Sequence, residues 1–280
     1  MEIKAADVKK MREKTGAGML DCKKALEEAG GDFAKAEKHL KELGLAAAAK
    51  RSDRATNEGR VFSRIASGSA GLLELSCETD FVARNSDFVA LGNAVLASAI
   101  EKKLQKPTDE LESMIKEAIG KIKENITLKR FTIIQIGSGE LVVDYIHGEG
   151  KIGVLVKAQS PNPADLSNPK VKEFVFDCAL HVAAFNPMFI DKEHVNPAYL
   201  KEQEEIFTKQ AEGLGKPANV LAGIIQGKIK KHIAEICFKD QPFVKDDKRA
   251  VQAVQNDLNK TEGTKVTITD YRYYRVGEEV

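Results

Sequence analysis

The stretch GLLELSCETDFVARNSDF, residues 71–88, decides the fold that the sequence predicts. It opens with the alternation of a half-buried strand, whose inward face carries Leu73, Leu75 and Cys77. It closes with a helix that Ser86 or Asp87 can cap. The apolar face of this helix consists of Phe88, Leu91, Gly92, Val95 and Ala99. The corner between strand and helix places a carboxylate beside an aromatic ring, and such corners lie at the surface and often carry function.

This corner consists of Thr79, Asp80, Phe81 and Val82. Phe81 is open to two interpretations. Counting in twos from Leu73 reaches Phe81 and puts its ring on the core side, the commoner place for a phenylalanine. Alternatively, the ring stands at the surface and meets a partner. Asp80 is either a solvated turn residue, a cap for the next helix or a functional carboxylate.

The composition limits the possible functions. The chain has 280 residues, 42% of them hydrophobic, which is enough for more than one domain. Lys and Arg number 43 against 42 Asp and Glu, and this balance argues against direct binding of nucleic acid. No apolar run reaches the ~20 residues that a membrane helix needs. The N-terminus is charged from its second residue and does not resemble a secretory signal, so we expect a cytoplasmic protein that binds no membrane.

The four cysteines are widely scattered and form no C-x-x-C pair; they are Cys22, Cys77, Cys178 and Cys237. Each falls in an apolar pattern, which favours buried free thiols. Cys178 and His181 could share one helix face, but two ligands do not make a metal site. The sequence therefore predicts no metal and no cofactor.

Residues 1–55 predict a docking module of three short helices with a linker. The predicted inward residues are Val8, Met11, Thr15, Met19, Cys22, Ala25, Leu26, Ala29, Phe33, Ala36, Leu40 and Leu43. Asp32 is a suitable N-cap for the third helix. Residues 45–60, rich in Ala and charge, are the expected linker, and their first half could extend that helix. Lys23 and Lys24 lie beside the apolar stripe, where solvated lysines are the default.

Two units of hairpin, loop and helix follow. The first has strands at 61–66 and 72–77, separated by residues 68–71, and a helix at 86–103. The second has strands at 141–146 and 152–158 and a helix at 170–185. Strands within 127–136 and 265–276 would complete the two sheets. We interpret this as an internal duplication in an α+β fold, with core subdomains at 56–136 and at 137–195 plus 236–280.

Residues 196–235 predict a pair of helices that breaks at Gly213, Gly215 and Pro217. The pair is either an ordinary hairpin packed on the core or an inserted arm. Because sheet-like sequence stands on both sides, we prefer an arm, and we expect the core to fold without it.

The chain has no phosphate-binding loop, no dinucleotide fingerprint, no G-x-S-x-G and no H-E-x-x-H. We therefore expect a protein that is not an enzyme and binds no nucleotide itself. Of the five histidines, only His147 occupies a turn tip flanked by glycine, where a side chain can reach a partner. A solvated turn histidine is the alternative.

Four motifs resemble the bacterial elongation factor Ts family: TGAGMLDCKKALEEAGGD at 15–32, CETDFVARNSDF at 77–88, HGEGKIGVLV at 147–156 and DQPFVKDD at 240–247. The resemblance spans almost the whole chain. It implies a ubiquitin-associated-like N-terminal module, two related core subdomains and a helical-hairpin (coiled-coil) insertion. It also implies a guanine-nucleotide exchange factor for the GTPase elongation factor Tu.

The resemblance assigns roles to single residues. Thr79, Asp80, Phe81 and Val82 match the segment that acts at the GTPase's magnesium and phosphate region, where the position of Phe81 enters a pocket and Asp80 supports it. Lys23 matches a lysine of the docking module, and His147 a histidine that faces the GTPase's third domain. The resemblance thus implies an exposed Phe81, against the alternation.

Two departures affect partner contacts. Lys123, Glu124 and Asn125 stand where members commonly have Gly-Glu-Asn, so Lys123 replaces a glycine, and the chain ends at Val280, where some members continue with a helix. A polypeptide-binding adaptor is the alternative function, and an RNA-binding translation factor is a weaker one because the charge is balanced.

Overall fold

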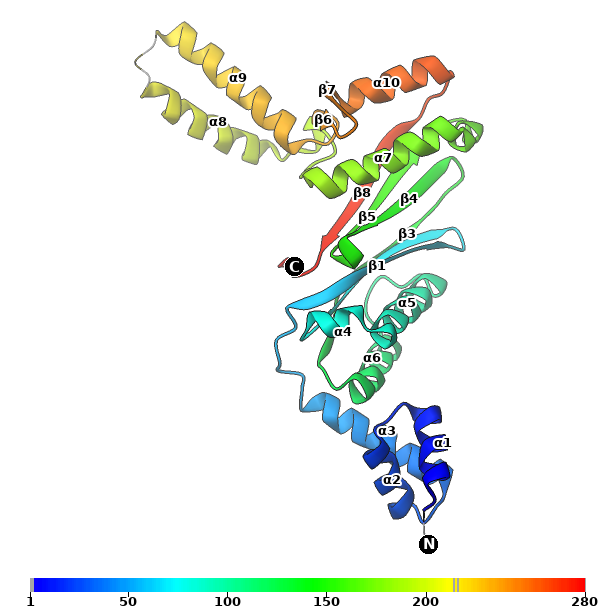
Figure 1. The fold of residues 1–280 in the computed structure, drawn as a ribbon. Helices are drawn as coiled ribbons and strands as arrows, with labels where there is room; N and C mark the ends of the chain where they lie inside the picture. Colours follow the sequence, from blue (N-terminus) through cyan, green and yellow to red (C-terminus); the bar gives the residue numbers. More distant parts are fainter. Residues whose placement is uncertain (1–2, 214, 216, 280) are drawn as a thin grey trace. The chain divides into compact units, whose positions relative to one another are not determined.

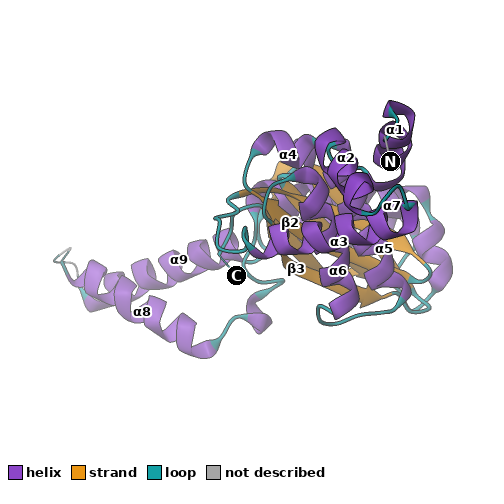
Figure 2. Ribbon diagram, turned by 90° about the horizontal axis from the view of Figure 1, so that it is seen from below, coloured by secondary structure: helices purple, strands orange, loops and turns teal. Residues whose placement is uncertain are grey.

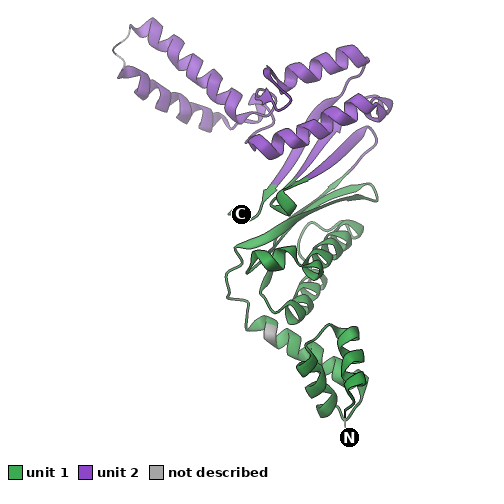
Figure 3. Cartoon of the chain, in the orientation of Figure 1, with its two compact units in different colours: residues 1–135, 146–153, 274–280 green, residues 136–145, 154–273 purple. Residues whose placement is uncertain are grey.

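The computed structural model describes residues 3–213, 215 and 217–279, with the side chains of all of these except residue 47. Val280, where the end of the chain was expected to affect partner contacts, lies outside the described residues. The chain divides into two compact units (Figure 3): one consists of residues 1–135, 146–153 and 274–280, the other of residues 136–145 and 154–273. Helices and small sheets make up both units (Figure 1), which confirms the α+β class.

The first unit begins with α1 (Ala5–Thr15), α2 (Met19–Glu28) and α3 (Phe33–Ala49). Asp32 caps α3, as predicted, by accepting hydrogen bonds from the backbone N–H groups of Ala34 and Lys35. The buried side chains of this helical cluster are Val8, Met11, Cys22, Ala25, Leu26, Ala36 and Leu40. Met19 and Leu43 were also expected to point inward, but they are 44% and 48% exposed. Met19 is the first residue of α2, and Leu43 lies beyond the last core residue of the cluster.

The expected linker at 45–60 is regular structure at both of its ends. Helix α3 continues to Ala49, and a strand begins at Glu58. Ala48 is buried among the side chains of the first sheet's core. The helix also packs closely on another helix, α6 (Asp109–Ile122), because a Cβ on Gly120 would lie only 2.9 Å from the Cα of Gly44. The helix extension was predicted, whereas this packing was not.

The first sheet has the strand order β1-β2-β3, and both pairs are antiparallel. Its strands are β1 (Glu58–Ala66), β2 (Ser69–Cys77) and β3 (Ile126–Gln135). The β1–β2 turn has only two residues, Ser67 and Gly68, with φ values of 53° and 68°. Positive φ at both positions is the geometry of the short turn that best matches strand twist. The predicted four-residue loop at 68–71 is therefore wrong.

Strand β2 is buried along its whole length, so the prediction of a half-buried strand is wrong. Helices α5 (Ser86–Glu101) and α6 (Asp109–Ile122) cover one face, as Figure 2 shows for β2 and β3. The other face lies against residues from 146–153 and 274–280, the two later stretches of the same unit. There, a Cβ on Gly153 would lie 2.9 Å from Leu72, and the Gly277 N–H donates to Glu74 at 3.3 Å. A central strand covered on both faces carries no solvated side.

The other sheet has the order β4-β5-β8 and belongs mostly to the second unit. Its strands are β4 (Glu140–His147), β5 (Ile152–Gln159) and β8 (Thr267–Arg275). The smaller sheet pairs β6 (Pro242–Phe243) with β7 (Asp246–Ala250). The main helices are α7 (Pro169–Phe185), which was predicted, and α10 (Val251–Glu262), which was not. Asn168 caps α7 by accepting from the Lys170 N–H at 2.9 Å, and Pro169 occupies its first position.

Helices α8 (Pro197–Glu212) and α9 (Ala218–Ile236) pack on each other. At their base, Ile233 and Ile236 are buried with Val195 and Cys237. Between the helices, the Tyr199 hydroxyl and a ring nitrogen of His232 lie 2.8 Å apart. The sequence predicted this helical pair.

All four cysteines are buried free thiols, as predicted. Burial raises the pKa of Cys77 to about 12 and that of Cys237 to about 11. His181 has a core role: it is buried, and a ring nitrogen lies 2.9 Å from the Gln241 side-chain oxygen. In the described part of the chain, no helix is long and apolar enough to cross a membrane. Nor do three or more His, Cys, Asp or Glu side chains in these residues gather to hold a metal ion.

Candidate partner-binding surface

The corner segment, residues 79–82, lies where β2 ends. Thr79 is the N-cap of a five-residue helix, α4 (Asp80–Arg84), and its hydroxyl accepts a hydrogen bond from the Val82 N–H at 3.3 Å. The next helix, α5, is capped by Asn85, whose side chain accepts from the Asp87 N–H at 2.7 Å. The predicted caps Ser86 and Asp87 are therefore wrong, because α4 occupies the preceding turn and leaves Asn85 in the extended cap position.

Phe81 is 83% exposed, the highest value among the large apolar side chains described. The alternation that put its ring on the core side applies only within a strand, and β2 ends at Cys77. From Asp80 the backbone is helical, so successive side chains turn by about a quarter of a circle and no longer alternate. Ala83 takes the inward position instead and is 5% exposed. The exposure implied by the family resemblance is confirmed, and the prediction from alternation is wrong.

Glu124 fixes the base of α4. Its carboxylate accepts hydrogen bonds from the backbone N–H groups of Glu78 and Thr79, at 3.1 and 3.0 Å. The Thr79 hydroxyl also donates to Glu124, at 2.7 Å. Both carboxylate oxygens are engaged, one by the two N–H groups and the other by the hydroxyl.

A second carboxylate, that of Glu78, accepts a hydrogen bond in return from the residue after Glu124. Glu78 accepts from the backbone N–H of Asn125 at 2.7 Å, and an Arg54 guanidinium nitrogen lies 3.3 Å from the same carboxylate. The Asn125 side-chain amide donates to the carbonyl of Arg54 at 2.8 Å. Residues 78, 79, 124 and 125 thus form a reciprocal arrangement, which we call the carboxylate clasp.

Arg84 connects α4 with the turn after β4. Its guanidinium nitrogens lie 3.6 Å from Asp80 and 3.6 Å from Glu149, which belongs to the 3-10 turn Gly148–Gly150. The three side chains are 45–74% exposed, so each pair contributes little to stability. His147 is exposed at the end of β4, directly before this turn. The structure therefore brings the corner segment and the residues that follow His147 into one part of the first unit.

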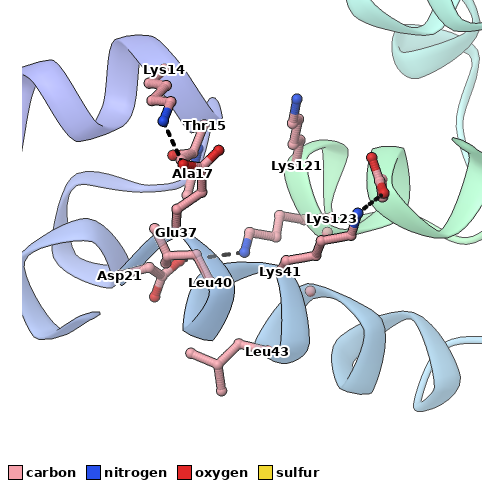
Figure 4. A pocket seen from close by; sticks show the side chains of 13 residues that line it. Lys14, Thr15, Ala17, Asp21, Glu37, Leu40, Lys41, Leu43, Lys121 and Lys123 are labelled. Carbon is pink, nitrogen blue, oxygen red and sulfur yellow. Dashed lines mark hydrogen bonds and ion pairs between the residues drawn. The ribbon is translucent and has the colours of Figure 1, made fainter. Parts of the chain in front are cut away.

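Lys23 lies elsewhere in that unit. It is exposed on α2, with its ammonium 3.7 Å from Glu27 one helical turn away. Near this helix, a cavity of about 390 Å³ opens between the first three helices and α6 (Figure 4). Lys41 pairs with Glu117 across it at 2.5 Å. Lys123 pairs with Asp21 at 3.4 Å.

Lys123 ends α6 in the left-handed conformation, with φ of 70°. A left-handed residue at a helix end is most often glycine, because a Cβ is strained there. The lysine that the sequence singled out therefore occupies a position that favours glycine.

Sequence reasoning missed the roles of three residues around the corner segment, Glu124, Asn125 and Arg84. Glu124 and Thr79 are separated by 45 positions, so no local pattern links them. The local signal was a pair of polar residues directly between an amphipathic helix and a strand, which predicts a turn but not its contacts. The family resemblance marked the same residues through its Gly-Glu-Asn, but it assigned no contact to Glu124 or Asn125.

A large aromatic ring exposed on a short, anchored helix, in a chain whose described residues form no metal cluster, is compatible with a protein that acts by binding another macromolecule. The comparisons with known proteins identify the family within that class.

The family model "Elongation factor TS" matches residues 78–278. Elongation factor Ts of Treponema denticola is 44% identical over 277 residues, covering 99% of both chains. Elongation factor Ts of Borreliella burgdorferi is 48% identical over 276 residues, covering 98% of this chain and 99% of that one. The protein of the same name from Borrelia hermsii is 46% identical over 278 residues. The chain belongs to the elongation factor Ts family, which confirms the resemblance carried by the four motifs.

Proposed function

We infer that this chain is a translation elongation factor that acts as the guanine-nucleotide exchange factor of the GTPase elongation factor Tu. Family membership over nearly the whole chain supports this function. The adaptor alternative is not favoured. Nucleotide exchange makes and breaks no covalent bond, so we propose a protein that is not an enzyme and carries no cofactor. In this proposal the nucleotide and its magnesium belong to the GTPase. The cytoplasmic location stays a prediction.

Exchange is a matter of linked binding. If the factor and GDP with magnesium each bind the GTPase well alone but poorly together, each weakens the other by the same free energy. The factor therefore accelerates release by contributing contacts that are incompatible with the bound nucleotide. No acid, base or nucleophile is required of the factor.

The exposure of Phe81 is the observation that carries the mechanism. Moving an exposed phenylalanine ring into an apolar pocket of the GTPase gains on the order of 1.5–3 kcal/mol. This gain offsets part of the magnesium and phosphate contacts that are lost. Little ordering entropy opposes it, because the carboxylate clasp already fixes the start of α4.

The other corner residues have supporting roles in this proposal. Thr79 caps α4, and Val82 forms its first turn. Asp80 faces the magnesium region of the GTPase. Its pair with Arg84 is long and half-exposed, so Asp80 can exchange that partner for another at small cost.

Further contacts and the domain architecture are also proposed. Lys23 contacts the GTPase from a ubiquitin-associated-like docking module at 1–55, and His147 contacts its third domain. Both side chains are exposed, as such contacts require. The core consists of two related subdomains, at 56–136 and at 137–195 plus 236–280, and residues 196–235 form an inserted coiled-coil arm. A three-stranded sheet in each half supports the duplication.

The test is release of a fluorescent GDP analogue from purified elongation factor Tu, with and without this chain. We expect an accelerated release that saturates with the factor concentration. Unchanged release in the presence of folded chain would contradict the proposal. Capture of RNA rather than the GTPase from a bacterial lysate would favour the RNA-binding alternative instead.

A further inference from the structure

Helix α4 has only five residues and cannot hold its own direction. Isolated helices of fewer than about 12 residues are marginal in water, so a helix of this length depends on what anchors its ends. Two inward anchors stand out. Ala83 is buried against the sheet core, and Thr79 at the N-terminus is held by the carboxylate clasp. The direction of Phe81, two residues after Thr79, follows from these anchors.

Glu124 is placed to act on α4 alone. The hydrogen bonds described for its carboxylate all come from Glu78 and Thr79, the residues directly before the helix. By contrast, Asn125 holds the carbonyls of Ser52 and Arg54, which lie before β1. The side chains of these two neighbouring residues thus bind different segments, and that of Glu124 holds the corner segment.

The chemistry at this position favours a carboxylate. Three donors converge on the two oxygens of Glu124, and donors to an ionised acceptor make stronger hydrogen bonds than donors to a neutral one. A glutamine keeps one acceptor oxygen for the two N–H groups, but it is neutral, and its NH₂ group reverses the third bond by donating to the Thr79 hydroxyl, which then can no longer donate to this side chain. The Thr79 hydroxyl gains as well, because donating to Glu124 leaves its lone pairs free to accept from Val82 and cap the helix.

We propose that Glu124 is a positioning residue for nucleotide exchange, which sets the direction of Phe81 by fixing the first turn of α4. The proposal rests on the exchange function inferred above. Glu124 itself does not touch the nucleotide or the magnesium. Its carboxylate acts through Thr79, and the strength of GTPase binding comes mainly from other contacts.

The test compares Glu124→Gln with the wild-type chain in release of a fluorescent GDP analogue. At saturating factor the release rate should fall by about 10-fold, because a small misplacement of the ring weakens its insertion into the GTPase. The affinity for nucleotide-free elongation factor Tu should fall by no more than the same factor, because only the contact of the ring is weakened and the other contacts to the GTPase remain. Glu112→Gln is the matched control, since Glu112 lies on α6, is half-exposed and pairs with Lys116. This control should exchange normally.

A second comparison asks whether Glu124 acts through Phe81. In a Phe81→Ala background, Glu124→Gln should slow release by less than about 2-fold, because no ring remains to be positioned. An equal loss in both backgrounds would overturn the proposal, since Glu124 would then act elsewhere. Normal exchange by a folded Glu124→Gln chain would overturn it too.

If Glu124→Gln fails to fold, Thr79→Val and Thr79→Ser test the same contact from the other side. Valine lacks the hydroxyl that donates to Glu124, whereas serine keeps it. We expect slow exchange for valine and near-normal exchange for serine, and equal rates would overturn the proposal. If the wild-type chain fails to accelerate release, the exchange function itself is wrong, and that result is distinct from either outcome above.

Discussion

Phe81 holds a large apolar surface in water, and the free chain gains nothing from it. Leaving such a ring exposed forgoes about 1.5–3 kcal/mol relative to burial. The fold could bury a side chain at this corner, since Ala83 two residues later is 5% exposed. An exposed ring on an anchored helix therefore adds nothing to stability, which agrees with the proposed role of Phe81 in contacting the GTPase.

Phe81→Ala should separate exchange from stability. With 83% of the side chain exposed, its removal should cost about 1 kcal/mol or less of unfolding free energy. Catalysed GDP release should slow severely at saturating factor. Thermal melts paired with fluorescence-monitored release measure both effects.

Phe88→Ala is the matched control, because Phe88 is fully buried on α5 a few residues later. It should cost about 3–5 kcal/mol of stability through lost burial and a cavity. Asp80→Ala should resemble Phe81→Ala in a milder form. A large melting shift with near-normal exchange for Phe81→Ala would count against ring insertion.

Lys123 offers a stability test at the end of α6. Its φ of 70° is unfavourable for any residue with a Cβ. Lys123→Gly should therefore be more stable than Lys123→Ala by about 1 kcal/mol. Both variants lose the half-exposed pair with Asp21, so their difference isolates the backbone conformation. Chemical denaturation measures it, and equal stability of the two variants would show that the lysine conformation carries no strain.

At the scale of elements, the sequence predicted most helices and strands but not how they are covered. The helix α7 and the three N-terminal helices follow from apolar spacing and caps that are local. The full burial of β2 depends on Gly153 and on Gly277, which are remote in sequence. Helix α6 was missed although Leu111, Ile115 and Ile119 repeat at helical spacing.

The contacts of Glu140 with the turn before β4 should make the free energy of unfolding decrease at acidic pH. Glu140 accepts from the Gly137 N–H at 2.8 Å and pairs with Lys157 at 2.6 Å, with its side chain only 14% exposed. These contacts lower the pKa of Glu140 from 4.5 to about 2. A lowered pKa contributes stability that is complete above pH 4.5 and is lost as the pH falls toward 2.

Glu140→Gln tests this dependence. The wild-type chain should exceed the variant by on the order of 2 kcal/mol at neutral pH, and the gap should close between pH 4.5 and 2. Denaturant melts across that range measure the difference. Glu13→Gln is the control, since Glu13 is 67% exposed and its loss should change little at any pH. A gap that stays constant with pH would show that the ionised Glu140 carboxylate is not its cause.

At the scale of the whole molecule, the sequence does not show that two later stretches join the first unit. The first unit gathers three stretches, residues 1–135, 146–153 and 274–280. The second and third stretches complete the core around β2. Their contacts with β2 join residues that are far apart in the sequence, so no local pattern predicts them. The corner segment was recognisable from its motif, whereas the carboxylate clasp depends on the β2–β3 pairing that brings residues 78 and 124 together.

The helical pair α8–α9 should differ in stability between its outer part and its base. Replacing residues 204–227 with a short Gly/Ser turn removes the outer turns but keeps the base, where Ile233 is buried with Val195 and Cys237. We expect the melting temperature to shift by less than about 3 °C, which corresponds to under 1 kcal/mol for a chain of this size.

The wider replacement of residues 197–235 is the contrasting variant. It would remove Ile233 from the buried base and Tyr199 from its bond with His232, so it should destabilise the second unit by several degrees. Differential scanning calorimetry of both variants compares the two effects. An arm that is self-contained to its ends would leave both variants equally stable. If the outer turns belong to a larger core, both replacements will lower the melting temperature. Only a small shift for residues 204–227 together with a large shift for residues 197–235 would show that the arm ends at its apolar base.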